Sequence, residues 1–424
     1  MFEANDILTL LGIPGNKIKS YTIDTVNDVS VVYIELHDIR RPCPKCGSTD
    51  ISIKDYYRVK INNSIIKHRQ LLVELRVRRY KCLKCGKTFK QEYDFYENRD
   101  RISIALKGQI LEDLKERNTF IQIARDHNVS PKTIRNIFDT FVLPQPQLPL
   151  TEIICVDEFC YKHKGKEDKY PFVITDPIST LILDIVKSRR KDVLIEYFNK
   201  VKVSQRYNVR YFVSDMNETY RIIKRIFFKN AIHIADRFHI VKAFNEAITS
   251  IRMRIIKQEV YQENEYNYLK KNWKIFLKDR HELSKKKYVD KWGIVTDPTV
   301  ALDRCLAKYP DLYYAYWTKE EFRHDTSRLL YYKKAEEVIN FYINKLSNST
   351  IEEIRVVGKM LENWKFEAIN GITQNPYSIK ISNAIAESTN NQIQTLIDLC
   401  YGLPEFNAMR KRVLYINRNR NQKD

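Results

Sequence analysis

The stretch Thr-Glu-Ile-Ile-Cys-Val-Asp-Glu-Phe, residues 151–159, decides how this chain is interpreted. Its apolar run, Ile153–Val156, predicts a short strand that is buried on both faces of a sheet. The strand ends in Asp157 and Glu158, at the carboxyl edge where α/β folds place their sites. A second run of the same form, Val209–Asp215, also ends in an aspartate. Carboxylates at the ends of two central strands suit a hard divalent cation held against phosphate oxygens.

The residues around this stretch predict the order β-β-β-α-β-α-β-α. The expected strands are 151–157, 170–175, 181–186, 209–215 and 232–235, and the expected helices are 192–201, 219–228 and a long one from about residue 237. This is the order of an RNase H-like domain, in which the first and fourth strands are neighbours, so Asp157 and Asp215 should meet. A helical insertion of about 255–370 should follow; it holds all four tryptophans, for which core packing is the default interpretation.

Glu387 is the candidate for a third acid. It begins a helical pattern in which Glu387, Asn390, Asn391, Gln394 and Asp398 share one stripe, opposite an apolar face. A solvated stripe is the alternative, but this one carries no lysine or arginine. We therefore expect this stripe to line the site of the acids, with Asn391 beside them.

Asp236 is a second candidate for the acid assigned to Asp215, because it ends the next expected strand. Its place directly before the helix that starts at Arg237 favours a helix cap instead. His239 follows one turn later. We expect Asp236 and His239 to support the metal-binding carboxylates without binding the metal.

The composition indicates a polyanionic partner. The formal net charge is +20, and seven of the fifteen residues 76–90 are basic while none is acidic. Codon bias in an A+T-rich genome explains part of the lysine content but not this clustering. The sequence shows neither a membrane-spanning apolar run nor a signal-peptide pattern, so we expect a cytoplasmic, nucleoid-associated protein without membrane contact.

Two C-x-x-C-G knuckles predict a zinc ribbon. Their four ligands are Cys43, Cys46, Cys82 and Cys85. Glycine after each knuckle lets backbone N–H groups turn towards the thiolates. A pair of structural disulfides is the alternative, which a cytosolic location disfavours. The strand between the knuckles alternates apolar and polar residues, and we expect Arg76, Arg78 and Arg79 to contact DNA phosphates.

Residues 101–141 have the spacing of a helix-turn-helix. Ala124 is small where two helices cross, Val129 fills the turn, and Ser130 caps the third helix with Pro131 at its first position. A three-helix core without a DNA role is the alternative. If the motif binds DNA, the residues that face the bases are Lys132, Thr133, Arg135 and Asn136. The proline-rich segment 144–149 is a stiff linker that ends the module.

These motifs, in this order, resemble the ISL-three family of bacterial insertion-sequence transposases. The most specific pieces are His-Ile-Ala-Asp-Arg-Phe-His at 233–239 and Ser-Asn-Ala-Ile-Ala-Glu-Ser-Thr-Asn-Asn at 382–391. The resemblance implies an RNase H-like fold and strand cleavage and transfer that depend on Mg²⁺ or Mn²⁺. By motif match it implies a DDE triad of Asp157, Asp215 and Glu387.

From this resemblance we expect three parts: a zinc-ribbon domain at 1–98, a helix-turn-helix at 99–143 and a catalytic domain at 150–424, so that the fold class is multidomain α/β. The expected partner is double-stranded DNA, as terminal inverted repeats and as target, bound by a homodimer or higher oligomer. The alternative function is a catalytically inactive relic or repressor that acts through residues 1–141. Intact acids at all three positions favour the active enzyme.

Overall fold

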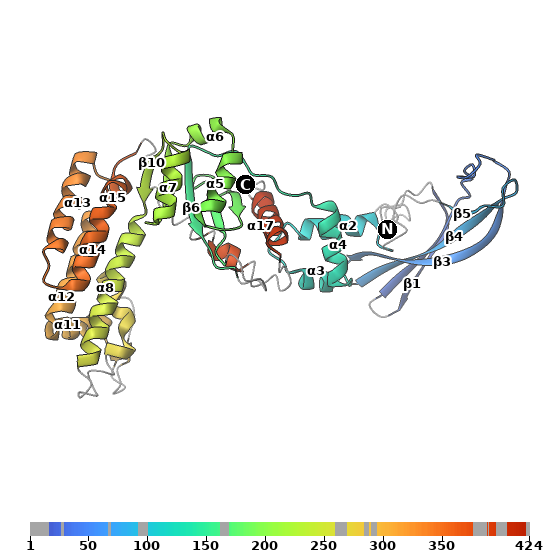
Figure 1. Ribbon diagram of the computed structural model, residues 1–424. Coiled ribbons are helices and arrows are strands. Elements are labelled where there is room, and N and C mark those ends of the chain that lie inside the picture. Colours follow the sequence, from blue (N-terminus) through green and yellow to red (C-terminus); the bar gives the residue numbers. More distant parts are fainter. Residues whose placement is uncertain are drawn as a thin grey trace. The chain divides into compact units, whose positions relative to one another are not determined.

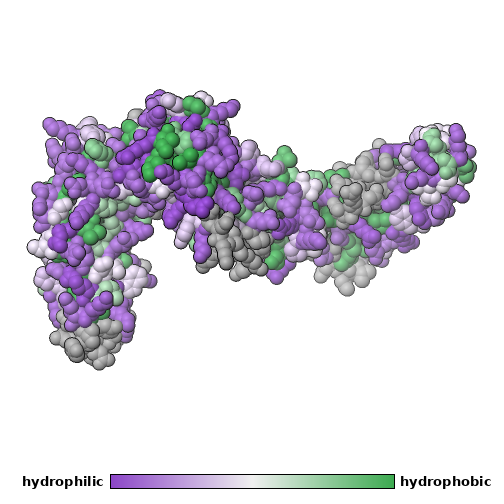
Figure 2. Space-filling model, viewed as in Figure 1, coloured by the Kyte–Doolittle hydropathy of each residue, from purple (hydrophilic) through white to green (hydrophobic). Residues whose placement is uncertain are grey.

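The computed structural model describes residues 17–26, 29–66, 69–91, 101–161, 169–258, 269–283, 288–289, 295–375, 388, 390–395 and 405–420. The chain forms two compact units, residues 1–145 with 395–424, and residues 146–394. On the face shown in Figure 2, hydrophilic residues cover most of the described surface, as the high net charge leads one to expect. Within the described ranges, no helix is both long enough and apolar enough to span a membrane.

The first unit begins with a long twisted sheet (Figure 1). Its strands are β1 (Ile18–Val26), β2 (Val29–Leu36), β3 (Ile51–Ile66), β4 (Arg69–Cys82) and β5 (Thr88–Lys90). The order is β1-β2-β4-β3, with β5 paired to β4, and only β2 and β4 run parallel. Alternate residues of β4, namely Val73, Leu75 and Val77, are buried in one apolar cluster with residues of β2. This period of two is the one that the sequence predicts for the strand.

Three short helices follow, α2 (Ile104–Asp113), α3 (Phe120–Asp126) and α4 (Pro131–Phe141). Each begins at a hydroxyl side chain that accepts a backbone N–H: Ser103 from Leu106, Thr119 from Gln122, and Ser130 from Thr133. Their apolar faces meet in one cluster around Ile123, Ile134 and Phe138. Asn128, in the turn between α3 and α4, has φ of 47°, a conformation that asparagine tolerates.

The last helix, α17 (Phe406–Arg420), packs on this three-helix bundle although more than 260 residues separate them. Tyr415 lies edge-on to Phe138, with ring centroids 6.0 Å apart. Arg412 is only 1% exposed, and its guanidinium donates to the carbonyls of Leu114 and Asn118, the latter at 3.1 Å. Backbone carbonyls just after α2 carry partial negative charge, which explains why an arginine is tolerated in this interior.

The second unit contains a mixed five-stranded sheet. Its strands are β6 (Ile153–Glu158), β7 (Phe172–Thr175), β8 (Ile182–Val186), β9 (Tyr211–Ser214) and β10 (Ile232–Ala235). The order is β10-β9-β6-β7-β8, in which β10, β9 and β6 are parallel and β7 is antiparallel to both neighbours. The connecting helices are α5 (Lys191–Lys200), α6 (Val203–Asn208) and α7 (Glu218–Phe227); the sequence did not predict α6. The first and fourth strands are adjacent, as the sequence predicts.

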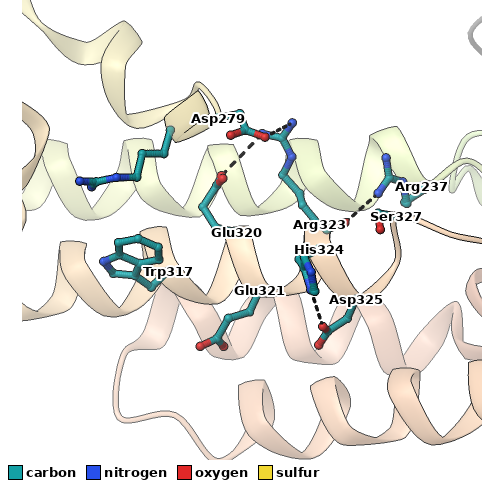
Figure 3. Close-up of a pocket in the computed structure, with 10 residues that line it drawn as sticks. Arg237, Asp279, Trp317, Glu320, Glu321, Arg323, His324, Asp325 and Ser327 are labelled. Carbon is teal, nitrogen blue, oxygen red and sulfur yellow. Dashed lines mark hydrogen bonds and ion pairs between the residues drawn. The ribbon is translucent and has the colours of Figure 1, made fainter. Parts of the chain in front are cut away.

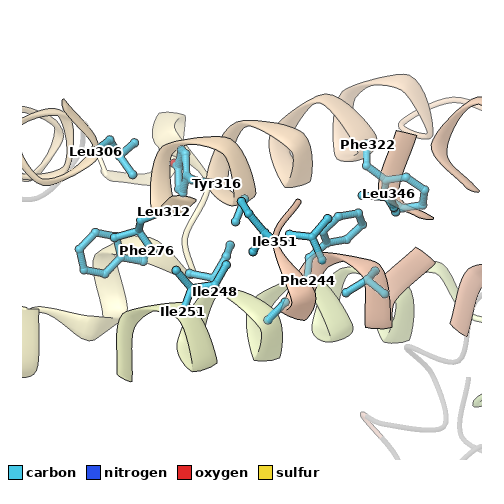
Figure 4. Packing of buried hydrophobic residues seen from close by; sticks show 14 of the residues in the cluster. Phe244, Ile248, Ile251, Phe276, Leu306, Leu312, Tyr316, Phe322, Leu346 and Ile351 are labelled. Atoms are coloured by element: carbon cyan, nitrogen blue, oxygen red, sulfur yellow. The ribbon is translucent and has the colours of Figure 1, made fainter. Parts of the chain in front are cut away.

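A helical bundle follows the sheet. It consists of α8 (Arg237–Gln258), the 3₁₀ helix η2 (Trp273–Phe276), α10 (Arg280–Leu283), α11 (Pro298–Lys308), α12 (Pro310–Asp325), α13 (Tyr332–Ser347), α14 (Glu352–Asn363) and α15 (Lys365–Ile372). Between α10 and α11 in sequence, β11 (Tyr288–Val289) and β12 (Val295–Thr296) pair antiparallel. Phe244 of α8 packs on Phe322 of α12, with ring centroids 5.4 Å apart, and Ile248 and Leu346 belong to the same core (Figure 4). The sequence predicts this bundle as an insertion but not its packing.

The bundle is held close to the sheet at α15. Gly371 lies so near β10 that a Cβ atom there would be 2.5 Å from the carbonyl oxygen of Ala235. Only glycine permits this approach. Because Ala235 directly precedes Asp236, the contact also fixes the end of β10.

Candidate active site and nucleic-acid interface

The four knuckle cysteines come together at one end of the first sheet. Their Sγ atoms all lie within 4.8 Å of one another, and the Cys43–Cys85 and Cys46–Cys82 Sγ pairs are 3.6 Å apart. Tetrahedral zinc with Zn–S bonds of about 2.3 Å requires S···S separations of about 3.8 Å. The donor set therefore fits a four-thiolate zinc site, and all four sulfurs are free thiols, so the disulfide alternative is not the arrangement in the structure.

Backbone N–H groups at the knuckles lower the pKa of two of the cysteines, Cys43 and Cys82. The N–H of Ser48 acts in the same direction on Cys46, but hydrogen bonds with the neighbouring thiols and burial raise the pKa of Cys46 to about 11. Gly47 and Gly86 have φ of 69° and 72°, and their N–H groups donate to the carbonyls of Cys43 and Cys82. Burial raises the pKa of Cys43, but N–H groups of Lys45 and Cys46 outweigh it and bring the pKa to about 6. The N–H of Cys85 likewise lowers the pKa of Cys82. These glycines have the role that the sequence predicts for them.

The basic strand between the knuckles differs from the sequence-based expectation at one residue. Arg78 is 3% exposed; it donates to the carbonyl of Leu36 at 2.6 Å and pairs with Glu35 at 3.0 Å. Its guanidinium therefore holds β4 to the end of β2 and is not presented to phosphates, because β2 and the segment after it cover that face. Arg76 and Arg79 keep about half of their side chains exposed while pairing with Glu35 and Asp55.

The helix-turn-helix exposes the predicted recognition face. Ile134, Ile137 and Phe138 of α4 are buried, while Lys132 and Asn136 are exposed and Thr133 and Arg135 are half-buried. Ala124 is 2% exposed, as the close crossing of α3 and α4 requires, and Val129 packs on the same core. The Thr133 hydroxyl is 2.8 Å from that of Ser130, and Arg135 lies 3.6 Å from Asp139.

The carboxyl edge of the second sheet brings aspartates from three adjacent parallel strands into register. Cys155 of β6 pairs with Val213 of β9, so Asp157 and Asp215 each lie two residues further along. Ala235 of β10 pairs with Ser214, which places Asp236 beside Asp215. Neighbouring strands are about 4.8 Å apart. The three carboxylates therefore leave the sheet in one row.

Asp215 is the least satisfied of these acids. Its Oδ1 is buried and finds no hydrogen-bond partner among the residues that the structure describes. Burial raises its pKa, and the neighbouring Glu158 carboxylate raises it further, to about 7. The positive charges of Arg189 and Lys242 lower this pKa, but they do not offset burial and the Glu158 carboxylate. The chemistry of the position thus fits a bound cation.

Asp236 adopts the capping geometry that the sequence predicts. Its Oδ1 accepts the N–H of Phe238 at 3.0 Å, its carbonyl accepts the N–H of His239 at 3.0 Å, and the residue is 3% exposed. His239 is half-buried next to it, and burial lowers its pKa, so it is neutral near pH 7. Its Nδ1 has no hydrogen-bond partner within the described ranges.

Asn390 contributes to the site from the far end of the unit's sequence. Its Nδ2 donates to Asp157 Oδ2 at 2.8 Å and to the carbonyl of Glu158 at 3.2 Å. Asn391 follows in the same helical segment, 390–395, where Ile393 is fully buried as its predicted apolar face requires. Glu387 lies outside the described residues. Asn390, which shares the predicted stripe with Glu387, nevertheless hydrogen-bonds the first acid, Asp157.

Glu158 has a role that the sequence did not indicate. Its carboxylate is held by the Arg189 guanidinium, from the loop before α5, and by the Tyr220 hydroxyl of α7. Tyr220 is fully buried and packs on Phe172, with ring centroids 5.3 Å apart. These partners lie 31 and 62 residues away in sequence, so local patterns carry no signal for them.

A second network that sequence reasoning missed joins the sheet to the helical bundle. Arg221 of α7 donates to Glu367 of α15 at 3.0 Å, and its guanidinium lies 3.5 Å from the ring centroid of Trp364. His233 of β10 bonds Ser214 Oγ at 2.9 Å, and Ser214 donates to the carbonyl of Asp215 at 2.7 Å. Asn370 of α15 donates to the carbonyl of His233 at 2.9 Å, which connects the bundle to the backbone of the second acid.

A helix-turn-helix and an acid-lined sheet edge in one chain are the combination expected of a DNA-processing protein. The family model described as "Transposase" of the ISL3 type matches residues 154–413, and the "Helix-turn-helix domain of transposase family ISL3" matches residues 91–142. The chain belongs to the ISL3 family of transposases. This is the family that its sequence motifs resemble.

A curated relative is the transposase for insertion sequence element IS1001 of Bordetella parapertussis. It is 22% identical over 262 residues, which are 61% of this chain and 59% of the relative. The chain therefore matches about three fifths of that protein's length.

Proposed function

We propose that this chain is an insertion-sequence transposase that binds the terminal inverted repeats of its element and cuts and joins DNA strands by a DDE mechanism. The observation that carries the proposal is the register of β6 and β9, which puts Asp157 and Asp215 side by side. The strand order β10-β9-β6-β7-β8, with an antiparallel second strand, supports an RNase H-like catalytic domain. Family membership supports the reaction class.

Asp157 and Asp215 would supply carboxylate oxygens to Mg²⁺ or Mn²⁺, with Glu387 as the third acid. When bound, a pair of such ions activates the attacking oxygen and stabilises the leaving oxygen of an in-line displacement at phosphorus. Asn390 orients Asp157 through its Nδ2. Arg189 and Tyr220 hold Glu158, which fixes the end of β6 and so the direction of Asp157.

Nicking of a labelled element end in Mg²⁺ or Mn²⁺ tests the triad. Asp157→Asn, Asp215→Asn and Glu387→Gln should each abolish cleavage and joining while DNA binding stays nearly intact. Asp236→Asn is the matched control, because asparagine caps a helix about as well as aspartate. Cutting by Asp215→Asn together with inactivity of Asp236→Asn would show that the second acid is misassigned. Binding by the unmodified chain without any cutting would favour the relic or repressor.

We also propose a division of labour in DNA binding. Helix α4 would contact bases, so Arg135→Ala should reduce discrimination for the element's end by about 1–3 kcal/mol. Arg76, which is exposed on the ribbon, would contact phosphates. Arg76→Ala should weaken binding to all sequences alike and reduce the salt slope by about 1. Identical behaviour of the two variants in a footprinting series would contradict this division.

A further inference from the structure

A pocket of about 540 Å³ lies in the helical bundle, and the charges that line it are paired within the protein (Figure 3). The Arg323 guanidinium lies 3.3 Å from Asp279 and 3.6 Å from Glu320. Glu320 also lies 3.1 Å from the Lys319 ammonium. These pairs leave little charge for a ligand to meet.

The tryptophans of the bundle contribute to its interior in different degrees. Trp364 is 4% exposed, and Trp317 packs on the bundle core beside the pocket, as the sequence-based interpretation expects. Trp273 is 42% exposed, and Trp292 lies outside the described residues. Core packing therefore accounts for Trp317 and Trp364 but not for Trp273.

A cluster of positive charge lies instead beside the row of acids, in the loop 187–191 that follows β8. Its five residues, Lys-Ser-Arg-Arg-Lys, carry four cations and no carboxylate. Strand β8 runs parallel to β6, because both pair antiparallel with β7. The loop therefore leaves the sheet at the same carboxyl edge as Asp157 and Asp215.

The register of the three strands sets the distance between this loop and the acids. Glu158 of β6 pairs with Phe172 of β7, and Phe172 pairs with Val186 of β8, so the ends of β6 and β8 are level. Neighbouring strands are about 4.8 Å apart, which separates β6 from β8 by about 10 Å. At a rise of about 3.4 Å per nucleotide of one DNA strand, this separation corresponds to about three nucleotides.

The central residues of the loop fix its backbone. The Arg189 guanidinium pairs with Glu158 and lies 4.7 Å from the ring centroid of Tyr170, and the Arg189 N–H donates to the Tyr170 carbonyl at 3.0 Å. Ser188 is 1% exposed, and its hydroxyl accepts the N–H of Arg190 at 3.1 Å. The loop is thereby attached to the end of the strand that carries Asp157.

The other side chains of the loop are exposed. Arg190 lies 3.5 Å from the exposed carboxylate of Asp192. Lys187 and Lys191 have no ion-pair partner in the part of the chain that the structure describes. Exposed lysines without a carboxylate partner can bind phosphate oxygens, and they do so by releasing counterions from the DNA.

We infer that the loop 187–191 is a phosphate-binding surface of the catalytic unit, and that Lys187 and Lys191 contact the DNA backbone about three nucleotides from the cut. The inference rests on the proposed function, because it takes DNA to be the substrate. The row of aspartates repels a DNA strand, and the two lysines supply positive charge at the same edge of the sheet. The loop adds a contact within the catalytic unit to those of α4 and the ribbon.

The test measures binding of the full-length chain to a duplex that carries the element's end, without added divalent metal. Joint replacement of Lys187 and Lys191 by alanine removes two phosphate contacts, so the slope of log K against log salt concentration should decrease by about 2. Methylphosphonate linkages, which carry no charge, are then placed singly along the strand. A linkage about three nucleotides from the cut should weaken binding of the unsubstituted chain by about 1.5- to 5-fold, and should not weaken binding of the double-alanine variant further.

Joint replacement of Lys202 and Lys229 by alanine is the matched control. Both lysines are exposed, and they precede β9 and β10 at the opposite, amino edge of the same sheet. This variant loses the same charge and should keep the methylphosphonate sensitivity of the unsubstituted chain. Joint replacement of Lys187 and Lys191 by arginine keeps the charge and should keep this sensitivity too.

Two results would overturn the inference while leaving the proposed function intact. One is an equal change of salt slope in the two double-alanine variants, which would show a general effect of charge. The other is a methylphosphonate sensitivity near the cut that persists without Lys187 and Lys191. Absence of binding by the unsubstituted chain would contradict the proposed function as well.

Discussion

Replacement of Glu367 by glutamine should destabilise the unit that carries the acids. Glu367 is the main partner of Arg221: Nε lies 3.0 Å from Oε1 and Nη2 lies 3.4 Å from Oε2, and the side chains are 12% and 8% exposed. His233 Nδ1 lies 3.6 Å from the same carboxylate, which is too long for a hydrogen bond. Removal of the Glu367 charge leaves the buried Arg221 guanidinium without its main negative partner.

The expected cost is about 3 kcal/mol, at the lower end of the 3–5 kcal/mol typical of a broken buried pair. The lower end applies because Arg221 keeps the carbonyl of Asn363 at 2.8 Å, the exposed Glu218 at 3.2 Å and the Trp364 ring. Simultaneous replacement of Arg221 and Glu367 by methionine should cost less than the single change, because no unpaired charge remains.

Urea unfolding followed by tryptophan fluorescence measures the effect, since all four tryptophans lie between residues 273 and 364. The midpoint should fall by about 1–2 M. Glu362→Gln, an exposed change of the same kind in the preceding helix, should stay within about 0.5 kcal/mol.

The effect also has a pH signature. Burial raises the pKa of Glu367, but His233, its own backbone N–H and Arg221 lower it below its usual 4.5. The carboxylate therefore stabilises the folded state above about pH 4.5, and this contribution is lost as the pH falls through the lower folded pKa. Two results would contradict this prediction. One is a free energy of unfolding of Glu367→Gln within about 1 kcal/mol of that of the unsubstituted chain at pH 7. The other is an equal loss of stability at pH 7 and at pH 3.

Three further predictions concern other parts of the chain. The pKa of Asp215 is raised to about 7 in the folded state, so the metal-free protein should lose stability as the pH rises from about 4 to 7. Melting measured over this pH range should show the loss in the unsubstituted chain and not in Asp215→Asn. Cys43→Ser should abolish binding of about one zinc per chain in metal analysis, and a folded unsubstituted chain without zinc would contradict the ribbon. Arg412→Met leaves three backbone carbonyls without their donor and should destabilise the helix-turn-helix bundle by about 2–4 kcal/mol. The expected result is faster hydrogen exchange in α2–α4. Unchanged exchange would show that this contact of α17 does not stabilise the bundle.

Features that depend on the local spacing of residues could be predicted from the amino-acid sequence. Two cysteines separated by two residues and followed by glycine predict a knuckle. Ser130-Pro131 after Val129 predicts a turn and a capped helix. Hydrophobic periodicity predicted the order of strands and helices along the chain. The adjacency of the strands that end at Asp157 and Asp215 was expected because this order matches that of an RNase H-like domain.

The pairing of polar side chains, in contrast, depends on the folded arrangement of the elements. Arg76 and Arg78 have the same local pattern, yet one is exposed and the other is buried against Leu36, because the segment after β2 covers only one of them. Glu158 with Tyr220, Glu367 with Arg221, and Arg412 with the carbonyls after α2 are pairs of residues far apart in the chain. Their energies arise from burial and distance, which hydrophobic periodicity does not encode, because it specifies the face of an element and not the partner opposite it.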